Sequence, residues 1–325
     1  MLRIALPNKG RLAEDVRELF NDAGLEVRSQ GDRALSASLG GEFEAIFVRS
    51  QDIPEFVADG AADAGVTGWD LISESGRQLE MLIDLEFGRC RLVVAARDDS
   101  GIASIEQIRP GARVATSFPS LSRSYFQKVG RQVEIVPVSG AAEIAPHLGI
   151  ADIVVDLTST GSTFKVNGLQ EIATILESSA RLFTAVWPLG SGQPLDSASL
   201  RSGRAEADSL RSGRTEGASL RSGRAGGASP EKKRALDDLV MALASVIRAR
   251  DKRYLMANVP RATLEKVRDV LPGLKGPTVV DILDGGAYVA VHAVVSAGSV
   301  YRTIASLKAL GCEGILVTRI ERLMP

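Results

Sequence analysis

Histidine and cysteine are both scarce in this sequence, with two residues of each among 325. His147 and His292 lie far apart, and neither has the spacing to a cysteine or to paired carboxylates that a metal site needs. Cys90 and Cys312 are too few and too distant in the chain for a disulfide framework. The sequence therefore argues against histidine-based catalysis, and its cysteines indicate buried thiols in a reducing compartment, with the cytoplasm as the default.

Long apolar runs and common nucleotide-binding motifs are also missing. No stretch approaches the roughly 18 consecutive apolar residues that cross a bilayer, and we expect no secretory signal. The chain has no G-x-x-x-x-G-K followed by Ser or Thr, no G-x-G-x-x-G after a strand and no G-x-S-x-G. These absences weigh against a P-loop NTPase, a dinucleotide-dependent dehydrogenase and a Ser-His-Asp hydrolase. The net charge of −1 argues against binding of nucleic acid or anionic membrane through a global field.

Residues 189–229 differ from the rest of the chain because most of them are Gly, Ser, Ala or Arg. A ten-residue unit that begins SLRSGR occurs three times in tandem, at 199–208, 209–218 and 219–228. One leucine per unit gives no apolar face, and its burial cannot offset the entropy of ordering about thirty residues. We therefore predict a disordered low-complexity insertion, with a weak polyanion tether as the alternative.

Short apolar runs alternate with amphipathic stretches over residues 1–188, which predicts an α/β catalytic region with mainly parallel sheet. A typical amphipathic stretch is Leu12–Ala23, where Leu12, Val16 and Leu19 fall on one helical face. The carboxyl ends of the strands are where open α/β sheets bind ligands. The predicted strands are Arg3–Leu6, Ala45–Val48, Ala64–Thr67, Met81–Leu85, Arg91–Ala96, Arg113–Thr116, Glu134–Val138 and Ile153–Leu157.

A well-marked connecting helix is predicted over residues 230–252, after Ser229 as N-cap. Over residues 253–325 the order changes to strand, helix, strand, strand, helix, strand, the ferredoxin-like pattern of a small α+β domain. We expect this domain to regulate or assemble the protein. Its predicted strands are Arg253–Val259, Thr278–Leu283, Ala287–Val295 and Ile315–Ile320, and its predicted helices are Ala262–Leu271 and Ser299–Leu310.

The clearest candidate site follows the predicted strand that ends near Leu157. Asp156 lies at the carboxyl end of this strand, and a turn rich in hydroxyl groups comes next. Backbone N–H groups and hydroxyls of such a turn suit a phosphate, and the start of the next helix adds a favourable dipole. Asp156 cannot favour a phosphate by charge, so the combination indicates a sugar phosphate; a helix cap with a structural aspartate is the alternative. The turn consists of Thr158, Ser159, Thr160, Gly161, Ser162 and Thr163.

Other predicted strand ends also carry polar residues. Lys9 and Arg11 flank a glycine after the first strand and could clamp phosphates, although a solvated turn is an equal alternative. Arg49 follows another strand, and Asp70 follows the glycine-containing edge Gly65–Gly68, which permits close approach of a planar ligand. A further such edge contains Thr116–Pro119 and Arg123. The Arg49 edge and the Gly65–Gly68 edge, each taken alone, are most simply structural turns, but the recurrence of such edges in one region favours a ligand site.

The motifs in their order resemble those of the ATP phosphoribosyltransferase family, and the C-terminal pattern resembles its long form. The resemblance covers about 1–187 and 230–325, whereas residues 189–229 replace a shorter link. Phe164 and Asn258 depart from the family pattern, and Asn258 leaves the strength of feedback inhibition open. The matching segments are Arg3–Leu12, Gln51–Pro54, Gly65–Gly68, Ala115–Pro119, Glu143 with Gly149–Asp152, Asp156–Thr163 and Val166–Leu169.

The resemblance implies a fold and an activity. The catalytic region is expected to have two periplasmic-binding-protein-like (type II) α/β lobes, the second over about 91–180, followed by an ACT-like domain. The implied reaction condenses ATP with phosphoribosyl pyrophosphate, with Mg²⁺, to give phosphoribosyl-ATP and pyrophosphate in the first step of histidine biosynthesis. Histidine is the implied inhibitor and a homohexamer the implied assembly, with a dimer as an alternative state.

The resemblance also assigns roles to residues of this sequence. The turn Thr158–Thr163 would hold the 5-phosphate, and Glu143 and Asp156 would contact the ribose hydroxyls. Lys9, Arg11 and Arg49 would neutralise phosphate oxygens, and Asp70 with its glycine loop would contact ATP. Effector binding would involve Asn258, Thr278, Val294 and Gly314. A non-catalytic cytoplasmic metabolite sensor built on the same fold is the alternative function.

Overall fold

The computed structural model describes residues 1–28, 34–186, 229–274, 276–283 and 286–324. It divides into two compact units: Met1–Phe20 with Leu25–Asp238, and Asn21–Gly24 with Leu239–Pro325. The predicted disordered insertion over 189–229 lies, apart from Ser229, outside the described residues.

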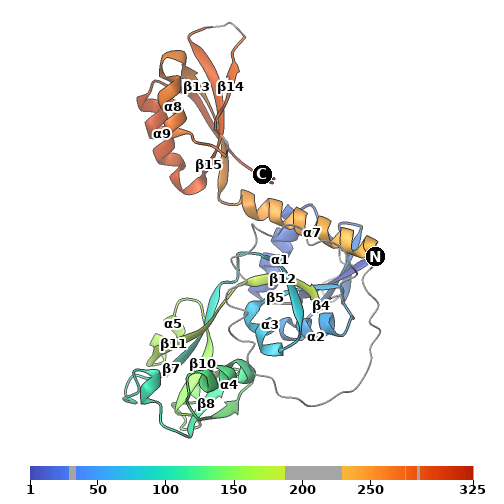
Figure 1. Ribbon diagram of the computed structural model, residues 1–325, viewed down its shortest axis with the longest axis vertical. Coiled ribbons are helices and arrows are strands. Elements are labelled where there is room, and N and C mark those ends of the chain that lie inside the picture. The colour runs from blue at the N-terminus through green and yellow to red at the C-terminus, as the bar shows by residue number, and fades with distance from the viewer. Residues whose placement is uncertain (29–33, 187–228, 275, 284–285, 325) are drawn as a thin grey trace. The chain divides into compact units, whose positions relative to one another are not determined.

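The first unit contains two sheets, which we call the first and second lobes together with the helices packed on them (Figure 1). Among the described residues, the sheet of the first lobe has the strand order β2-β3-β4-β1-β5-β12-β6. β1 pairs in parallel with β4 on one side and β5 on the other, and the outer strands are antiparallel. The strands are β1 (Leu2–Pro7), β2 (Val27–Arg28), β3 (Ser36–Leu39), β4 (Phe43–Val48), β5 (Ala64–Gly68), β6 (Leu79–Asp84) and β12 (Ala180–Ala185).

The sheet of the second lobe has the order β11-β7-β10-β8-β9 among the described residues. Parallel pairing joins β10 to β8 and β8 to β9, whereas β7 is antiparallel to both of its neighbours. The sheets are therefore mixed, and the expectation of mainly parallel sheet holds only for β4-β1-β5 of the first sheet and β10-β8-β9 of the second. The strands are β7 (Cys90–Arg97), β8 (Ala112–Thr116), β9 (Val133–Pro137), β10 (Ile153–Thr158) and β11 (Leu169–Ser178).

The helices of the lobes bury one face each. In α1 (Arg11–Asp22) the buried side chains are Ala13, Val16, Leu19 and Phe20, which confirms the predicted amphipathic helix. The other helices of the lobes are α2 (Ile53–Ala58), α3 (Trp69–Ser75), α4 (Pro119–Lys128) and α5 (Ser162–Val166).

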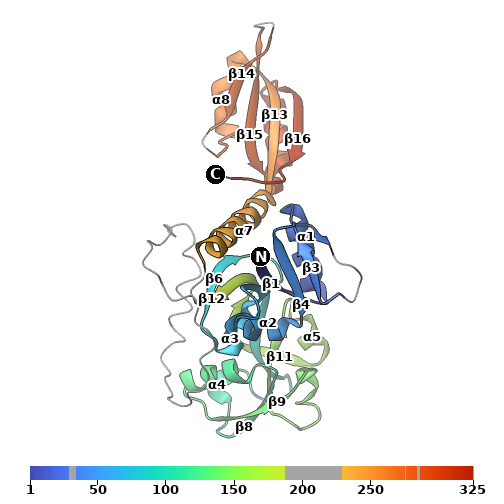
Figure 2. The same ribbon diagram turned by 90° about the vertical axis from the view of Figure 1, so that its right-hand side faces the viewer.

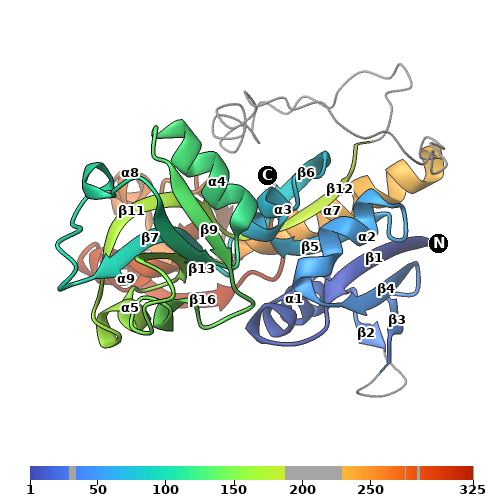
Figure 3. The ribbon, with the colours of Figure 1, turned by 90° about the horizontal axis from the view of Figure 1, so that it is seen from below.

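The chain crosses between the two lobes twice. β6 of the first lobe leads through residues 85–89 into β7 of the second, and β11 of the second lobe leads through Ser179 into β12 of the first. Figure 3 shows both sheets with the strands of the second crossing running between them. Two α/β lobes joined in this way form the type II periplasmic-binding-protein-like architecture that the sequence predicts.

The second unit has the predicted ferredoxin-like domain. Its strands lie in the order β14-β15-β13-β16 with antiparallel pairing throughout, as Figure 2 shows. Both of its short helices cover the same face of the sheet, which buries Leu255, Ala257 and Val259 of β13. The elements are α7 (Pro230–Ala249), which begins in the first unit, β13 (Lys252–Pro260), α8 (Leu264–Val270), β14 (Thr278–Asp281), β15 (Tyr288–Ser296), α9 (Val300–Ala309) and β16 (Glu313–Arg319).

All twelve predicted strands are present with shifts of a few residues at their ends. The strands that the sequence analysis missed are β2, β3, β11 and β12. β11 carries two register irregularities against β7, so its half-buried residues do not alternate cleanly. No helix of the described residues is long and apolar enough to span a membrane.

The core of the first lobe yields a stability prediction. Phe183 of β12 is fully buried against Ile53 and Val57 of α2, whereas Phe56 of the same helix is 38% exposed. We expect Phe183→Ala to lower the free energy of unfolding by about 3–5 kcal/mol, because it leaves a cavity in a packed core. Phe56→Ala should cost less, roughly 1–2 kcal/mol, because its ring is partly exposed to water and its removal leaves no enclosed cavity.

Urea unfolding followed by circular dichroism measures both variants. Equal losses for the two phenylalanines would contradict the packing of β12 against α2.

Candidate functional site

Three neighbouring strands of the first lobe bring the predicted cationic and glycine-containing edges together. Parallel pairing places the ends of β4, β1 and β5 side by side (Figure 3), and the Asn8 N–H donates to the Val48 carbonyl at 2.9 Å. Lys9 and Arg49 therefore follow adjacent strand ends, and Arg11 begins α1 from the same loop. The topology confirms that these segments share one edge of the sheet.

The three cations at this edge are exposed. Within the described residues, no ion pair involves Lys9, Arg11 or Arg49. Gly10, between the first two, adopts a φ of +83°, a conformation that lets the chain turn sharply from β1 into α1. Exposed cations outside any ion pair suit a polyanionic ligand such as a chain of phosphates.

The two glycines of β5, Gly65 and Gly68, are explained by packing that the sequence analysis did not foresee. A Cβ at Gly65 would lie 2.6 Å from Ile53 Cγ2 and 2.9 Å from Val57 Cγ2, so this glycine lets α2 pack against the sheet. A Cβ at Gly68 would lie 2.2 Å from an Asp70 carboxylate oxygen. Packing of α2 and the position of the Asp70 side chain therefore account for both glycines without a ligand.

Asp70 is buried rather than presented at the edge with the cations. Its side chain is only 4% exposed and accepts a hydrogen bond from Ser178 Oγ at 2.6 Å. Burial raises the pKa of this carboxyl, although the Ser178 hydroxyl and nearby backbone N–H groups oppose the shift. Burial, together with the negative charge of Asp70, also raises the pKa of the neighbouring Cys90 thiol to about 11. Asp70 therefore lies in the interior, at the crossing between the lobes, and not at the edge with the cations.

The hydroxyl-rich turn of the second lobe leads from β10 directly into α5. Thr158 is buried, and its hydroxyl accepts the Gly161 N–H at 2.8 Å, which fixes the curvature of the turn. The hydroxyls of Thr160 and Ser162 lie 2.9 Å apart. The exposed members of the turn are Ser159, Thr160, Ser162 and Thr163.

The backbone conformation at position 161 and the close approach of a neighbouring side chain require a glycine there. Gly161 has a φ of +76°, and a Cβ there would lie 2.7 Å from Glu171 Oε1 of β11. Glu171 forms an ion pair with Arg91 across the sheet. Since α5 has only five residues, its dipole adds little, and the local hydroxyls and N–H groups carry the capacity to bind an anion.

Asp156 and Glu143 form a pair of nearby carboxylates beside this turn. Asp156 lies in β10, and Glu143 lies in the 3-10 turn Ala142–Ile144. Burial raises the pKa of the Asp156 carboxyl, and the charge of Glu143 raises it further, whereas the hydrogen bond from the Leu157 N–H opposes the shift. An uncompensated carboxylate pair next to a hydroxyl-rich turn can accept hydrogen bonds from sugar hydroxyls or contribute to a cation site.

The predicted effector residues fall into two groups on the helix-free face of the second unit. Gly314 lies against Asn258, because a Cβ there would be 2.9 Å from Asn258 Nδ2. Thr278 pairs with His292, and Val294 follows two positions later on the same face of β15. Asn258 pairs with Ala290, two residues before His292 and four before Val294, so Thr278 and Val294 lie about 7 and 13 Å from Asn258 along the strand direction. A single chain therefore does not gather all four residues.

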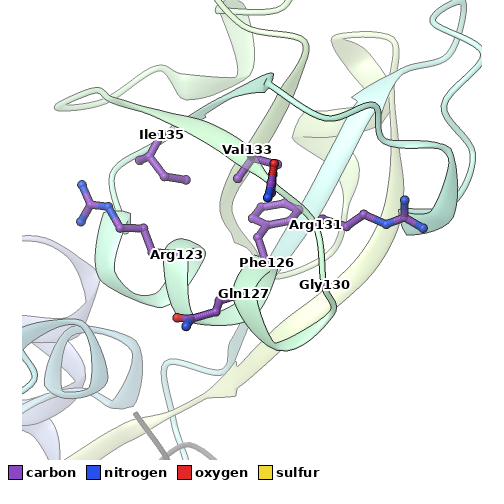
Figure 4. A pocket seen from close by; sticks show the side chains of 8 residues that line it. Arg123, Phe126, Gln127, Gly130, Arg131, Val133 and Ile135 are labelled. Atoms are coloured by element: carbon purple, nitrogen blue, oxygen red, sulfur yellow. The ribbon is translucent and has the colours of Figure 1, made fainter. Parts of the chain in front are cut away.

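A shallow pocket of about 430 Å³ lies elsewhere, between α4 and β9 of the second lobe. Figure 4 shows Phe126 at its centre, with the side chains of Arg123 and Arg131 pointing away from each other. Apart from Arg123, it contains none of the predicted site residues. Arginines that diverge do not form a clamp, so this pocket does not compete with the polar edges as a ligand site.

The sequence analysis missed several polar residues near the predicted site. Ser178 and Ser179 bond to Asp70 and Asp84, and Glu74 of α3 bonds to α4. None of them follows a predicted strand or belongs to a motif, so no local signal could have identified them.

The family models and the full-length relatives point to one family. The model of the family described as ATP phosphoribosyltransferase matches residues 49–189, and the model described as HisG, C-terminal domain, matches residues 249–322. A relative named ATP phosphoribosyltransferase from Gemmatimonas aurantiaca is 64% identical over 328 residues that cover 100% of both chains. A relative of the same name from Haloarcula marismortui is 44% identical over 99% of this chain and 100% of its own.

A solved structure, the ATP phosphoribosyl transferase (HisG:HisZ) complex from Thermotoga maritima, contains a chain that is 28% identical to this one. The match has a TM-score of 0.51 and covers 65% of this chain and 94% of that chain.

The carboxylate pair leads to a prediction about stability. Because the folded state raises the pKa of Asp156, its ionised form costs stability, and this cost grows as the pH rises above the ordinary carboxyl range. We expect Asp156→Asn to raise the melting temperature at pH 7, whereas its effect should vanish near pH 3, where the carboxyl is protonated in both states.

Asp152→Asn is the matched control with the opposite sign. Burial alone would raise the pKa of Asp152. Hydrogen bonds from the Arg113 N–H and the Arg109 guanidinium have the larger effect, so the pKa is lowered. That carboxylate stabilises the folded state above the ordinary carboxyl pKa, so its loss should lower the melting temperature at pH 7. Scanning calorimetry at both pH values measures the two variants, and a lower melting temperature for Asp156→Asn at pH 7 would refute the prediction.

Proposed function

The chain belongs to the ATP phosphoribosyltransferase family, and from this membership we propose that the polar edges of its two lobes together form the catalytic site. The protein is a phosphoribosyltransferase of histidine biosynthesis, as its full-length relatives are. The observation that supports this location is the complementarity of the edges: unpaired cations in the first lobe, hydroxyls and carboxylates in the second. A non-catalytic sensor with the same fold is disfavoured by identity to enzymes over the whole chain.

The substrates are ATP and phosphoribosyl pyrophosphate. Ring nitrogen 1 of adenine attacks the anomeric carbon of the ribose, a carbon–nitrogen bond forms, and the bond from that carbon to the pyrophosphate oxygen breaks. The electron pair of the broken bond leaves with pyrophosphate. The attacking nitrogen already has a free electron pair, so no general base is needed to generate it, and positioning with charge stabilisation can carry the catalysis.

The turn Thr158–Thr163 holds the 5-phosphate of phosphoribosyl pyrophosphate in this proposal. Its exposed hydroxyls and the backbone N–H groups around Gly161 donate hydrogen bonds to phosphate oxygens. Thr158 supports the turn from beneath through its bond to the Gly161 N–H. The carboxylates of Asp156 and Glu143 accept hydrogen bonds from the ribose hydroxyls next to that phosphate.

Lys9, Arg11 and Arg49 neutralise the pyrophosphate and triphosphate oxygens. All three are exposed at one edge of the first lobe, so they can contact a ligand that lies across the ends of β1 and β4. Negative charge grows on the pyrophosphate as the bond to the sugar breaks, and fixed cations stabilise that charge. We place the end of β5, Gly65–Gly68, near ATP. The buried Asp70, which follows this strand and accepts the hydrogen bond from Ser178, stabilises the segment.

Mg²⁺ fits this site as an ion shared with the substrates. No group of three or more His, Cys, Asp or Glu side chains among the described residues could hold a metal alone. One or two carboxylates with substrate phosphates are a common Mg²⁺ site, and Asp156 with Glu143 provides such a pair. When bound, the ion would neutralise phosphate charge, and a nearby cation would also relieve the repulsion between the two carboxylates.

Histidine is the proposed inhibitor, and the second unit is its proposed binding domain. Asn258 with Gly314, and Thr278 with Val294, lie on the same helix-free sheet face but at separate places, so a second copy of the chain would help to complete a pocket. We accordingly propose a homo-oligomer, a hexamer with a dimer as an alternative state. The two free thiols, Cys90 and Cys312, support a reducing compartment such as the cytoplasm.

Thr160→Val tests the location of the phosphate site. The variant removes one hydroxyl from the turn without changing the size of the side chain, so the KM for phosphoribosyl pyrophosphate should rise roughly tenfold or more. The KM for ATP should change far less. Initial rates follow from the near-ultraviolet absorbance of the nucleotide product in the presence of Mg²⁺.

Thr318→Val on the exposed part of β16, in the second unit, is the matched control and should leave both KM values unchanged. Equal increases in the two KM values for Thr160→Val would place the phosphate site elsewhere.

Asn258→Ala tests the effector proposal. Removing the side-chain amide should raise the histidine concentration for half-inhibition roughly tenfold, because the ligand loses a hydrogen bond to a polar partner. The same absorbance assay, run over a histidine titration, measures the shift. If millimolar histidine does not inhibit the unmodified enzyme, the second unit binds another effector or serves assembly only.

A further inference from the structure

One carboxylate of α3 joins the two lobes beyond the apolar contacts that Trp69 and Leu71 of the same helix make with the core of the second lobe. Glu74, near the end of α3 in the first lobe, accepts the Ser120 N–H at 2.8 Å and the Leu121 N–H at 2.9 Å. Both N–H groups belong to the first turn of α4 in the second lobe, and α3 contacts α4 directly (Figure 2). Each carboxylate oxygen of Glu74 therefore holds one N–H of the opposite lobe.

The contact takes the place of a local helix cap. The residue before α4, Phe118, provides no capping side chain, and Thr116 Oγ1 accepts the Phe118 N–H and the Ser122 hydroxyl rather than the N–H of Ser120 or Leu121. The first turn of a helix leaves N–H groups without partners and favours a negative charge. Glu74 supplies both the acceptors and the charge from the other lobe, so separation of the lobes at this point leaves the start of α4 without either.

The same helix is anchored at its other end by buried contacts. Asp70, one turn before Glu74, bonds to Ser178, and the Trp69 N–H donates to the Ser179 carbonyl at 2.9 Å. Ser179 Oγ also donates to the Asp84 carboxylate at 2.8 and 2.9 Å. These contacts surround the second crossing. Glu74 is half-buried, whereas Asp70 is almost completely buried, so the Glu74 contact is the more accessible to water.

We propose that Glu74 is a positioning residue that latches the two lobes together, with the buried contacts of Asp70 and Ser178 as the fixed point about which they separate. Opening of the lobes breaks the two hydrogen bonds of Glu74 and leaves those of Asp70 in place. Glu74 thereby sets the fraction of molecules in which the polar edges of both lobes can contact one ligand.

The kinetic consequence rests on the proposed function, in which the catalytic site takes residues from both lobes. If only the latched arrangement binds substrates productively, the apparent dissociation constant equals the intrinsic one divided by the latched fraction. Weakening the latch then raises the KM of each substrate, measured with the other substrate well below saturation, by a similar factor. The kcat stays unchanged, because saturating substrates restore the latched arrangement.

The test uses Glu74→Gln in the full chain. The carboxamide keeps the size of the side chain but has one oxygen acceptor and no charge, so it cannot hold both N–H groups. Glu134→Gln, an exposed substitution in β9 of the second lobe, is the matched control. Circular dichroism and thermal melting verify that both variants are folded.

Three measurements follow on each variant without and with substrates. Hydrogen exchange by mass spectrometry reports the amides of Ser120 and Leu121, small-angle X-ray scattering reports the radius of gyration, and initial rates report KM and kcat. For Glu74→Gln we expect faster exchange at these amides, a larger radius of gyration without substrates, and both KM values raised roughly tenfold at unchanged kcat. The control should match the unmodified enzyme in all three.

The outcomes separate the latch from the location of the catalytic site. Faster exchange with unchanged radius and unchanged KM values would overturn the latch and leave Glu74 as a helix cap only. A larger radius with unchanged KM values would support the latch and instead contradict a catalytic site shared between the lobes. A fall in kcat with unchanged KM values would also overturn the latch, because it would place Glu74 in the chemical step.

Discussion

One continuous segment, Leu169–Ala185, contributes a strand to each of the two sheets of the first unit. The position of one lobe relative to the other depends on the hydrogen bonds at the middle of this segment. The segment changes sheet at Ser178 and Ser179, whose hydroxyls bond to Asp70 and Asp84 of the first lobe. Because these serines are buried, water competes weakly for their hydrogen bonds, and the crossing is well defined. The ends of the flanking strands are thereby fixed relative to one another, which a ligand bound by both lobes requires.

The two lobes carry different chemistry on this common frame. The first lobe presents exposed cations where parallel strands end. The second presents hydroxyls, N–H groups and the carboxylates of Asp156 and Glu143, of which Asp156 has a raised pKa. The net charge of −1 conceals this separation, because acidic side chains elsewhere balance the cations. A substrate that is polyanionic at one end and a sugar phosphate at the other suits such a division. The raised pKa of Asp156 is a cost in stability that the fold tolerates at a position we propose to be functional.

Most of the fold could be predicted because its signals are local. Buried strands such as Ile153–Thr158 are continuous apolar runs, and α1 repeats its apolar residues at helical spacing. The strands β11 and β12 were missed because half-buried and irregular pairing blurs their alternation. The candidate site residues that the sequence indicated are those that follow the ends of predicted strands. Asp70 follows such an end as well, yet its side chain turns inward to Ser178, an interaction 108 residues away in the chain.

The sequence by itself determined the family, the α/β and ferredoxin-like patterns, and the segments that carry polar residues at strand ends, because motifs and periodicity are properties of neighbouring residues. Only the tertiary structure decided that Gly65 and Gly68 serve packing, that the four effector positions form two groups in one chain, and that Glu74 of one lobe caps a helix of the other. Those features depend on which backbones lie against each other, and hydrogen bonds over such distances leave no trace in local composition.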